Sequence, residues 1–136
     1  MLQKAKNIYH FLVALAAVAW YRWPGKSLTL IGVTGTDGKT TTTTLIYHLL
    51  QTAGKKVAMV TSVAAYLGHE AINTGFHVTS PDPWPLQRLL RRVADNGYQY
   101  MVLEVTSHGL DQFRILGCHF YLSVLTNITH EHLDYH

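Results

Sequence analysis

A loop suited to binding phosphate is the clearest chemical feature of the sequence. Residues 34–41 read TGTDGKTT, directly after the apolar residues 28–33 and before a segment that favours a helix. A strand, a glycine-containing turn and a helix in that order place backbone N–H groups and a helix N-terminus around phosphate oxygens. Lys39 would then reach the β and γ phosphates, and the Thr40 hydroxyl would bind Mg²⁺. The pattern predicts a site for ATP with Mg²⁺.

The loop departs from the strict form of this motif. The strict form has a glycine five residues before Gly38, where this chain has Val33, and the glycine of this loop is Gly35. Asp37 also brings a carboxylate near the expected phosphates, which should weaken binding unless the side chain points outward or a cation or backbone donor offsets the repulsion. An ordinary turn is the alternative, but it does not explain the order of strand, Gly-Lys-Thr and helix. We interpret the loop as a shorter variant of the motif.

An acid and a group of histidines extend the possible chemistry. Glu104 ends the apolar residues 100–104, and phosphate-loop enzymes use such an acid to hold Mg²⁺ directly or through water. A strand-terminal glutamate alone is more often solvated, but the phosphate loop favours the magnesium role. Three histidines and two acids lie within residues 130–136. A zinc site from the whole cluster is disfavoured, because His130 and His132 would face opposite sides of a helix. One histidine near the nucleotide-bound metal is easier to build.

The elements that must position these residues alternate in the α/β manner. Strands are predicted at residues 28–33, 56–62, 100–105 and 120–125, helices at residues 39–53 and 82–96, and a loop or hairpin at residues 66–78. For the second helix, Asp82 is a good N-cap, Pro83 suits the first helical position and Gly97 ends it. Strands separated by helices imply right-handed crossovers and a largely parallel sheet with helices on both faces. Ligands bind beyond the carboxyl ends of such strands.

The N-terminal segment, residues 1–26, has two interpretations. Lys4 and Lys6, followed by the apolar residues 11–20, resemble a secretory signal peptide. Export would take the phosphate loop away from ATP, however, and the run is too short for a membrane span, which needs about 20 apolar residues. We favour a helix that packs on the body or on a missing neighbour through apolar residues at helical spacing, namely Ile8, Leu12, Leu15 and Ala19.

Composition fits one globular domain, here residues 27–136 after the N-terminal helix and linker. The 136 residues are 48% hydrophobic and 14% charged, which is ordinary for a protein with a real core. The single Cys118 cannot form an internal disulfide, and one cysteine beside nine histidines does not fit a cysteine-rich zinc scaffold. We therefore expect a cytoplasmic protein. The sequence has no long basic run of the kind found in nucleic-acid-binding proteins. Its net charge of +3 suits a small anionic substrate.

From about residue 30 to residue 136 the motifs resemble, in order and spacing, the central domain of the Mur ligases. They are most similar to the UDP-N-acetylmuramyl-tripeptide synthetases, whose central domain is P-loop NTPase-like. The segments that carry the resemblance are residues 34–41, TSPD at 79–82, EVTSHGL at 104–110, Gln112, Arg114, Thr126-Asn127 and HLDYH at 132–136. The combination is far more specific than any one motif. It implies a peptidoglycan-precursor enzyme that adds an amino acid to UDP-N-acetylmuramoyl-L-alanyl-D-glutamate through an acyl phosphate formed with ATP.

The resemblance also implies roles for individual residues. ATP would be bound by the loop residues Gly35, Thr36, Asp37, Gly38, Lys39, Thr40 and Thr41. The magnesium ions would be held by Thr40, Glu104 and His132, and the catalytic residues would be Lys39, Glu104 and His132. The UDP-muramoyl peptide would be held by Thr79, Ser80, Thr106, Gln112 and Arg114. Asp37 stands where the family usually has Asn, and Thr106 where it usually has Ser, so the second change keeps the hydroxyl.

Parts of the family pattern are missing from the sequence. They are the N-terminal uridine-binding domain, the rest of the central domain with its modified lysine, and the C-terminal domain that chooses the amino acid. We therefore interpret the chain as an incomplete fragment whose parent protein supplies the C-terminal ligase domain, and expect the fragment alone to be inactive in ligation. The alternatives are a folylpolyglutamate or cyanophycin synthetase-type ligase, disfavoured by residues 108–114, and a non-catalytic nucleotide-binding module whose N-terminal helix docks on a partner.

Overall fold

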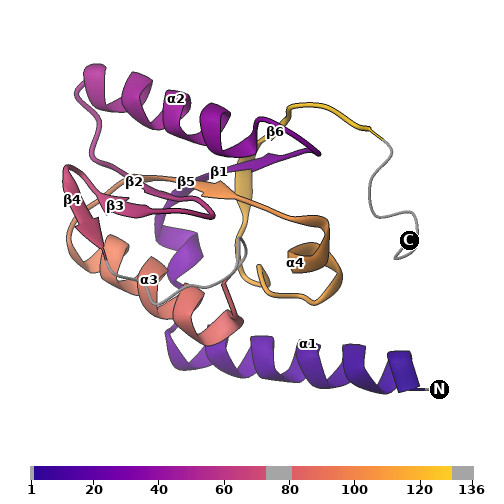
Figure 1. Ribbon diagram of the computed structural model, residues 1–136. Coiled ribbons are helices and arrows are strands. Elements are labelled where there is room, and N and C mark those ends of the chain that lie inside the picture. The colour runs from indigo at the N-terminus through magenta and orange to yellow at the C-terminus, as the bar shows by residue number, and fades with distance from the viewer. Residues whose placement is uncertain (1, 73–80, 130–136) are drawn as a thin grey trace.

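The computed structural model describes residues 2–72 and 81–129, with side chains from Lys6 onward. They form a six-stranded sheet in the order β4-β3-β2-β5-β1-β6, with helices on both faces (Figure 1). The strands are β1 (Thr29–Thr34), β2 (Val57–Val60), β3 (Ala65–Leu67), β4 (Glu70–Ile72), β5 (Tyr100–Glu104) and β6 (Phe120–Leu125). The helices are α1 (Leu2–Trp20), α2 (Lys39–Thr52), α3 (Pro83–Asp95) and the short α4 (Ser107–Asp111), with a 3-10 turn η1 (Pro24–Ser27) after α1.

The strand directions confirm the predicted, largely parallel sheet. β2, β5, β1 and β6 run parallel, so their carboxyl ends lie at one edge. β3 pairs antiparallel with β2, and β4 pairs antiparallel with β3. They form the hairpin expected within residues 66–78, with Gly68 in the left-handed conformation at its turn. A hairpin reverses the chain within a few residues, so it adds antiparallel strands, whereas parallel neighbours need the helical crossovers found elsewhere in the chain.

Two apolar clusters cover the two faces of the sheet. On one face, Leu86, Leu90 and Val93 of α3 pack with residues such as Leu30 and Leu103 of the central strands. On the other face, α2 packs on the alternate residues of the same strands, among them Ile31, Val33 and Val102. Successive side chains of a strand point to opposite faces, which is why β1 contributes to both clusters. The central strands are therefore buried on both sides, and they hold the ends of β1 and β5 in fixed positions.

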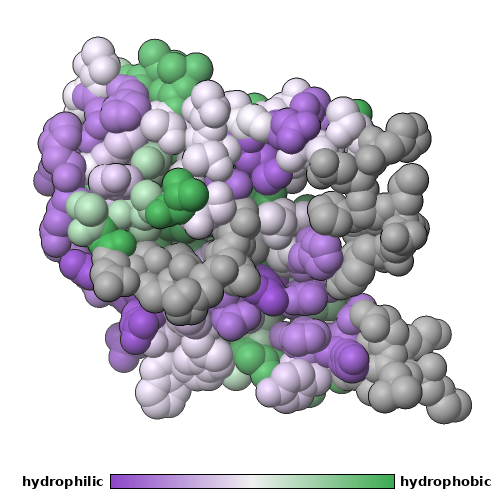
Figure 2. All heavy atoms as spheres, in the orientation of Figure 1, coloured by the Kyte–Doolittle hydropathy of each residue, from purple (hydrophilic) through white to green (hydrophobic). Residues whose placement is uncertain are grey.

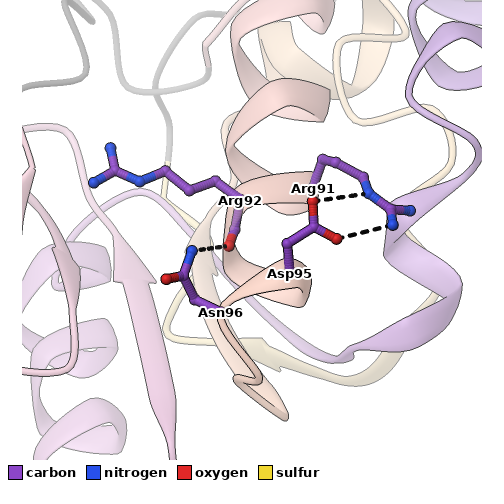
Figure 3. A network of polar contacts seen from close by, with 4 residues as sticks. All are labelled: Arg91, Arg92, Asp95 and Asn96. Carbon is purple, nitrogen blue, oxygen red and sulfur yellow. Dashed lines mark hydrogen bonds and ion pairs between the residues drawn. The ribbon is translucent and has the colours of Figure 1, made fainter.

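The start of α3 differs in one detail from the sequence prediction. Pro83 occupies the first turn and Gly97, at φ 74°, follows the helix as expected. Asp82 has the extended backbone of an N-cap, but its side chain makes no capping hydrogen bond. It lies instead with Oδ1 3.4 Å from Nη1 of Arg114, a long-range ion pair that the local sequence does not reveal. At the other end, Arg91 pairs with Asp95, and Asn96 Nδ2 donates to the Arg92 carbonyl oxygen at 2.7 Å (Figure 3).

The N-terminal segment is helical, as predicted, but it packs through a different face. Ala14, Ala17 and Val18 are fully buried. Of the predicted stripe, Ile8 is 61% exposed and Leu12 56%, with Leu15 and Ala19 also exposed.

On the buried face, α1 approaches the body closely. A Cβ placed on Gly117 would lie 2.8 Å from Cγ2 of Val18, so Val18 packs where position 117 has no side chain. The predicted face was therefore wrong for contact with the body. Because Ile8, Leu12, Leu15 and Ala19 are exposed, the alternative that this face packs on a missing neighbour stays a prediction. Within the described residues, no helix has the length and apolar character needed to cross a membrane.

Candidate functional site

The phosphate loop connects β1 to α2, at the carboxyl edge of the sheet. Gly38 is the N-cap of α2 and has φ 78°, a left-handed conformation that glycine adopts without steric cost. Gly35, at φ 136°, also has a backbone conformation that favours glycine, and a Cβ there would in addition clash with Oγ1 of Thr126. The helix begins at Lys39, so the N–H groups of its first turn have no partner within the helix. These N–H groups and the helix dipole make the loop an anion site.

Lys39 is folded across the loop that would hold the phosphates. Its Nζ donates to the carbonyl oxygens of Gly35 and Thr36, each at 2.8 Å. The ammonium group therefore lies over the loop, within an open pocket of about 290 Å³. The pocket also reaches Thr106, Ser107 and His108 after β5, and its lining is completed by Thr34, Leu125, Asn127, Ile128 and Thr129. One pocket thus joins the predicted nucleotide residues to Thr106, a predicted substrate residue.

Oxygen groups from the first turn of α2 and from the ends of β2 and β5 meet beside the loop. The Thr40 hydroxyl donates to Oε2 of Glu104 at 2.9 Å, and the backbone N–H of Ser62 donates to the same oxygen at 3.1 Å. Oγ of Ser62 lies 3.3 Å from Oγ1 of Thr40. Glu104 is only 2% exposed, so these donors stabilise a buried acid. A carboxylate with two hydroxyls supplies the hard oxygen ligands that Mg²⁺ prefers, so these residues fit that ion.

Ser62 was missed by the sequence interpretation. It follows β2, and a signal for it was present, since β2 is parallel to β5 and its carboxyl end must lie at the same edge. The third predicted magnesium ligand, His132, lies outside the described residues. Among the residues that the structure describes, no group of three or more His, Cys, Asp or Glu side chains is placed to hold a metal ion. The described part of the site therefore consists of one acid and two hydroxyls.

Asp37 is exposed, and the loop holds it by its main chain. Its N–H donates to Oδ1 of Asn127 at 2.9 Å, and its carbonyl oxygen accepts from the Thr126 hydroxyl at 2.6 Å. The exposure of Asp37 agrees with the outward alternative considered from the sequence. The effect of the carboxylate on ATP affinity stays a prediction.

The predicted substrate residues fall into separate groups. Thr106 lines the pocket, and its hydroxyl accepts from the N–H of Gly109 to cap α4. Arg114 and Gln112 lie together, with Nε of Arg114 donating to Oε1 of Gln112 at 2.8 Å. Phe113 between them has φ 54°. The ion pair of Arg114 with Asp82 places these side chains near the start of α3. Thr79 and Ser80, which directly precede that region in sequence, lie outside the described residues.

Burial affects two ionisable groups outside this site. Cys118 packs against the apolar cluster under α3, and desolvation raises the pKa of its thiol to about 12. Burial, followed by the nearby Tyr98 hydroxyl, raises the pKa of Tyr47. The Tyr47 hydroxyl donates to the Gly68 carbonyl oxygen and accepts from Nε2 of Gln51, so it ties α2 to the hairpin. Both groups are neutral at physiological pH and serve packing.

Comparisons with known proteins agree with this architecture. Residues 33–136 match the family model of the Mur ligase middle domain. The chain is 47% identical over 124 residues to a UDP-N-acetylmuramoyl-L-alanyl-D-glutamate–2,6-diaminopimelate ligase of Bacteroides fragilis, covering 91% of this chain and 25% of that protein. It is 42% identical over 127 residues to the enzyme of the same name from Geobacillus thermodenitrificans, again covering 91% and 25%.

A solved structure of a UDP-N-acetylmuramoyl-L-alanyl-D-glutamate–2,6-diaminopimelate ligase shares the fold. It superposes with a TM-score of 0.71 at 33% identity, over 80% of this chain and 22% of that one. The chain thus spans about a quarter of the length of the curated relatives it matches. The family model covers most of the chain, with the phosphate loop and Glu104 inside the matched residues. On this evidence, the chain belongs to the Mur ligase family and carries the family's middle domain.

Proposed function

We propose that this chain is the ATP- and Mg²⁺-binding part of an enzyme that adds an amino acid to UDP-N-acetylmuramoyl-L-alanyl-D-glutamate in the cytoplasm. The observation that carries the proposal is the meeting of Lys39, Thr40 and Glu104 at the carboxyl ends of β1 and β5. The relatives are named for the ligation of 2,6-diaminopimelate, so that amino acid is the first to test. The choice of amino acid is not encoded by any residue described here.

The loop and Lys39 account for the first half of the reaction. ATP would phosphorylate the terminal carboxylate of the precursor, which gives an acyl phosphate and ADP, and an incoming amine would then displace phosphate to form the amide. The first-turn N–H groups of α2 and the Lys39 ammonium would neutralise negative charge on the transferred phosphoryl group. Bound Mg²⁺, held by Thr40 and Glu104, would supply further positive charge to the same oxygens. Positioning and charge stabilisation provide most of the catalysis in such transfers.

Arg114 and Gln112 are the proposed contacts to the UDP-muramoyl peptide. A guanidinium binds a carboxylate or phosphate with two parallel hydrogen bonds. Arg114 already faces an acid, Asp82, whose side chain is largely exposed. A substrate anion would share or replace that partner, and the Gln112 amide, bonded to Nε of Arg114, would keep the guanidinium oriented. The Thr106 hydroxyl would act nearer the phosphates, because it lines the same pocket as Lys39.

Calorimetric titration of Mg·ATP into the 136-residue chain tests the proposal. We expect Lys39→Ala to weaken binding about 10- to 100-fold, the usual range for losing hydrogen bonds to a charged group. Lys26→Ala is the matched control, because Lys26 is an exposed lysine in η1, outside the loop and the pocket lining. Equal affinity in the Lys39 variant and the control would contradict the assignment of the loop.

A further inference from the structure

We propose that Thr126 and Asn127, directly after the edge strand β6, are positioning residues that hold the phosphate loop in its nucleotide-binding shape. We call these two residues the loop brace. The inference rests on the proposed function of the loop. It assigns a role to a segment that lies about 90 residues after the loop in sequence. The loop brace makes contacts with both the entry and the exit of the loop, and each contact restricts a different part of its backbone.

Thr126 fixes the two ends of the turn. Its N–H donates to the Thr34 carbonyl oxygen at 2.9 Å, which continues the pairing of β6 with β1. Its hydroxyl lies 2.6 Å from the carbonyl oxygen of Asp37 and 3.2 Å from that of Thr34. A hydroxyl has one hydrogen to donate, and the shorter contact makes Asp37 the main acceptor. Thr126 therefore links the strand end to the residue just before the helix cap.

Asn127 holds the middle of the loop. Its Oδ1 accepts from the N–H of Asp37 at 2.9 Å, and its carbonyl oxygen accepts from the N–H of Thr36 at 3.3 Å. Two residues further along the same segment, the N–H of Thr129 donates to Oγ1 of Thr36 at 3.0 Å. The N–H groups of Thr36 and Asp37 are thereby directed toward the segment after β6. Those of the first turn of α2 are left for phosphate, because the helix itself cannot pair them.

The fit of Gly35 against the loop brace shows how close this contact is. A Cβ on Gly35 would approach Oγ1 of Thr126 to 2.1 Å and the N and O atoms of Asn127 to 3.0 Å. The loop can lie against the segment after β6 only because position 35 has no side chain. A loop ordered before ligand binding loses less conformational entropy when the ligand binds, so the loop brace should raise nucleotide affinity by ordering the loop in advance.

The test compares Asn127→Ala and Thr126→Val with Thr126→Ser and Asn96→Ala in the 136-residue chain. Thr126→Ser keeps the hydroxyl. Asn96→Ala is the matched control, because it also removes an asparagine side-chain hydrogen bond to the main chain, at the far end of α3 (Figure 3). Two quantities are measured, namely amide hydrogen exchange at Thr36 and Asp37 without nucleotide, and the Kd for Mg·ATP. Urea unfolding of each variant separates a loss of global stability from a change confined to the loop.

We expect Asn127→Ala and Thr126→Val to speed amide exchange at Asp37 and to raise the Kd by about tenfold, as the loss of one hydrogen bond of ordinary strength gives. Thr126→Ser and Asn96→Ala should leave both quantities near the wild-type values. Unchanged exchange, or an unchanged Kd in a chain that binds Mg·ATP, would overturn the loop brace. If the wild-type chain binds no nucleotide, the proposed function fails. The exchange rates alone then decide whether the loop brace exists.

Discussion

The phosphate-loop region and the helix α1 differ in which kinds of side chain they bury and which they expose to solvent. Glu104 is buried, and its carboxylate receives hydrogen bonds from Thr40 and Ser62. On α1, by contrast, large apolar side chains such as Ile8 and Leu12 are more than half exposed. A buried charge is retained only with partners, whereas a contiguous apolar surface marks a site of contact. The buried carboxylate beside the loop therefore finds its hydrogen-bond partners within the described chain. The outer face of α1, in contrast, is suited to contact with another surface.

Apolar exposure continues on two other elements. On the edge strand β6, Tyr121 is 83% exposed, and Leu122 and Leu125 are at least half exposed. On α2, Leu45 and Leu49 are exposed, and Figure 2 shows hydrophobic surface over this helix. These surfaces lie around the site and do not form its lining, apart from Leu125. The described chain therefore has a polar centre with fixed geometry and an apolar periphery.

The largest expected effect concerns the thiol of Cys118, which packs against the apolar cluster under α3. Cys118 lies beside Gly117, against which Val18 of α1 packs. Its pKa of about 12 is raised by burial from an ordinary value of about 9. At pH 8 the thiolate fraction should be about a thousandfold lower in the folded chain than in urea, and alkylation by iodoacetamide correspondingly slower. The measurement is the ratio of the two alkylation rates, and similar rates would show that the folded chain does not shield the thiol.

The same pKa predicts a dependence of stability on pH, with a definite sign. The folded state retains the Cys118 proton at pH values where the unfolded state has lost it, so the free energy of unfolding falls as pH rises. The contribution of Cys118 is fully present below about pH 9 and is lost progressively as the pH approaches 12. Cys118→Ala removes this part of the slope, which urea titrations at pH 8 and pH 10 would measure.

The next effect compares the two faces of α1 with the same substitution. Val18→Gln places an amide in a fully buried position that has no room for it, and should lower the free energy of unfolding by about 3 kcal/mol. Leu12→Gln changes an exposed residue of the same helix and should stay within about 0.5 kcal/mol. Urea unfolding measures both. Equal losses at the two positions would show that the outer face is as important to the chain's stability as the inner one.

Much of the central architecture was predictable because its signals are local. The strands around the loop, the helices α2 and α3 and the place of Glu104 follow from apolar runs, glycine positions and the rule that ligands bind at the carboxyl ends of parallel strands. The helical nature of α1 was equally local. Its packed face was not, because it depends on contact with a distant segment, where Val18 packs against Gly117.

Contacts between distant segments set the limit of the sequence interpretation. Asp82 has the right type and position for a helix cap, yet Arg114 engages its side chain. Ser62 and the loop brace gain their positions from the pairing of β2 with β5 and of β6 with β1. Such roles depend on strand order and register, which local patterns do not specify. Thr106 shows both aspects, since its place after β5 was predictable and its capping bond to Gly109 was not.

The smallest expected effect tests whether the polar centre serves magnesium as well as folding. Glu104→Gln keeps the size of the side chain and one oxygen that can still accept from Thr40 and Ser62, but it removes the negative charge. The substitution should weaken ATP binding about tenfold in the presence of Mg²⁺, because an amide oxygen is a poorer ligand for that ion than a carboxylate. Binding of ATP without Mg²⁺ should stay the same or strengthen, since a negative charge near the phosphates is gone.

Glu70→Gln, in the exposed hairpin strand β4, is the control. Calorimetry with and without Mg²⁺ separates the two cases. A loss of affinity that is equal in both would mean that Glu104 only holds Thr40 and Ser62 in place, and the magnesium role would then have to be withdrawn.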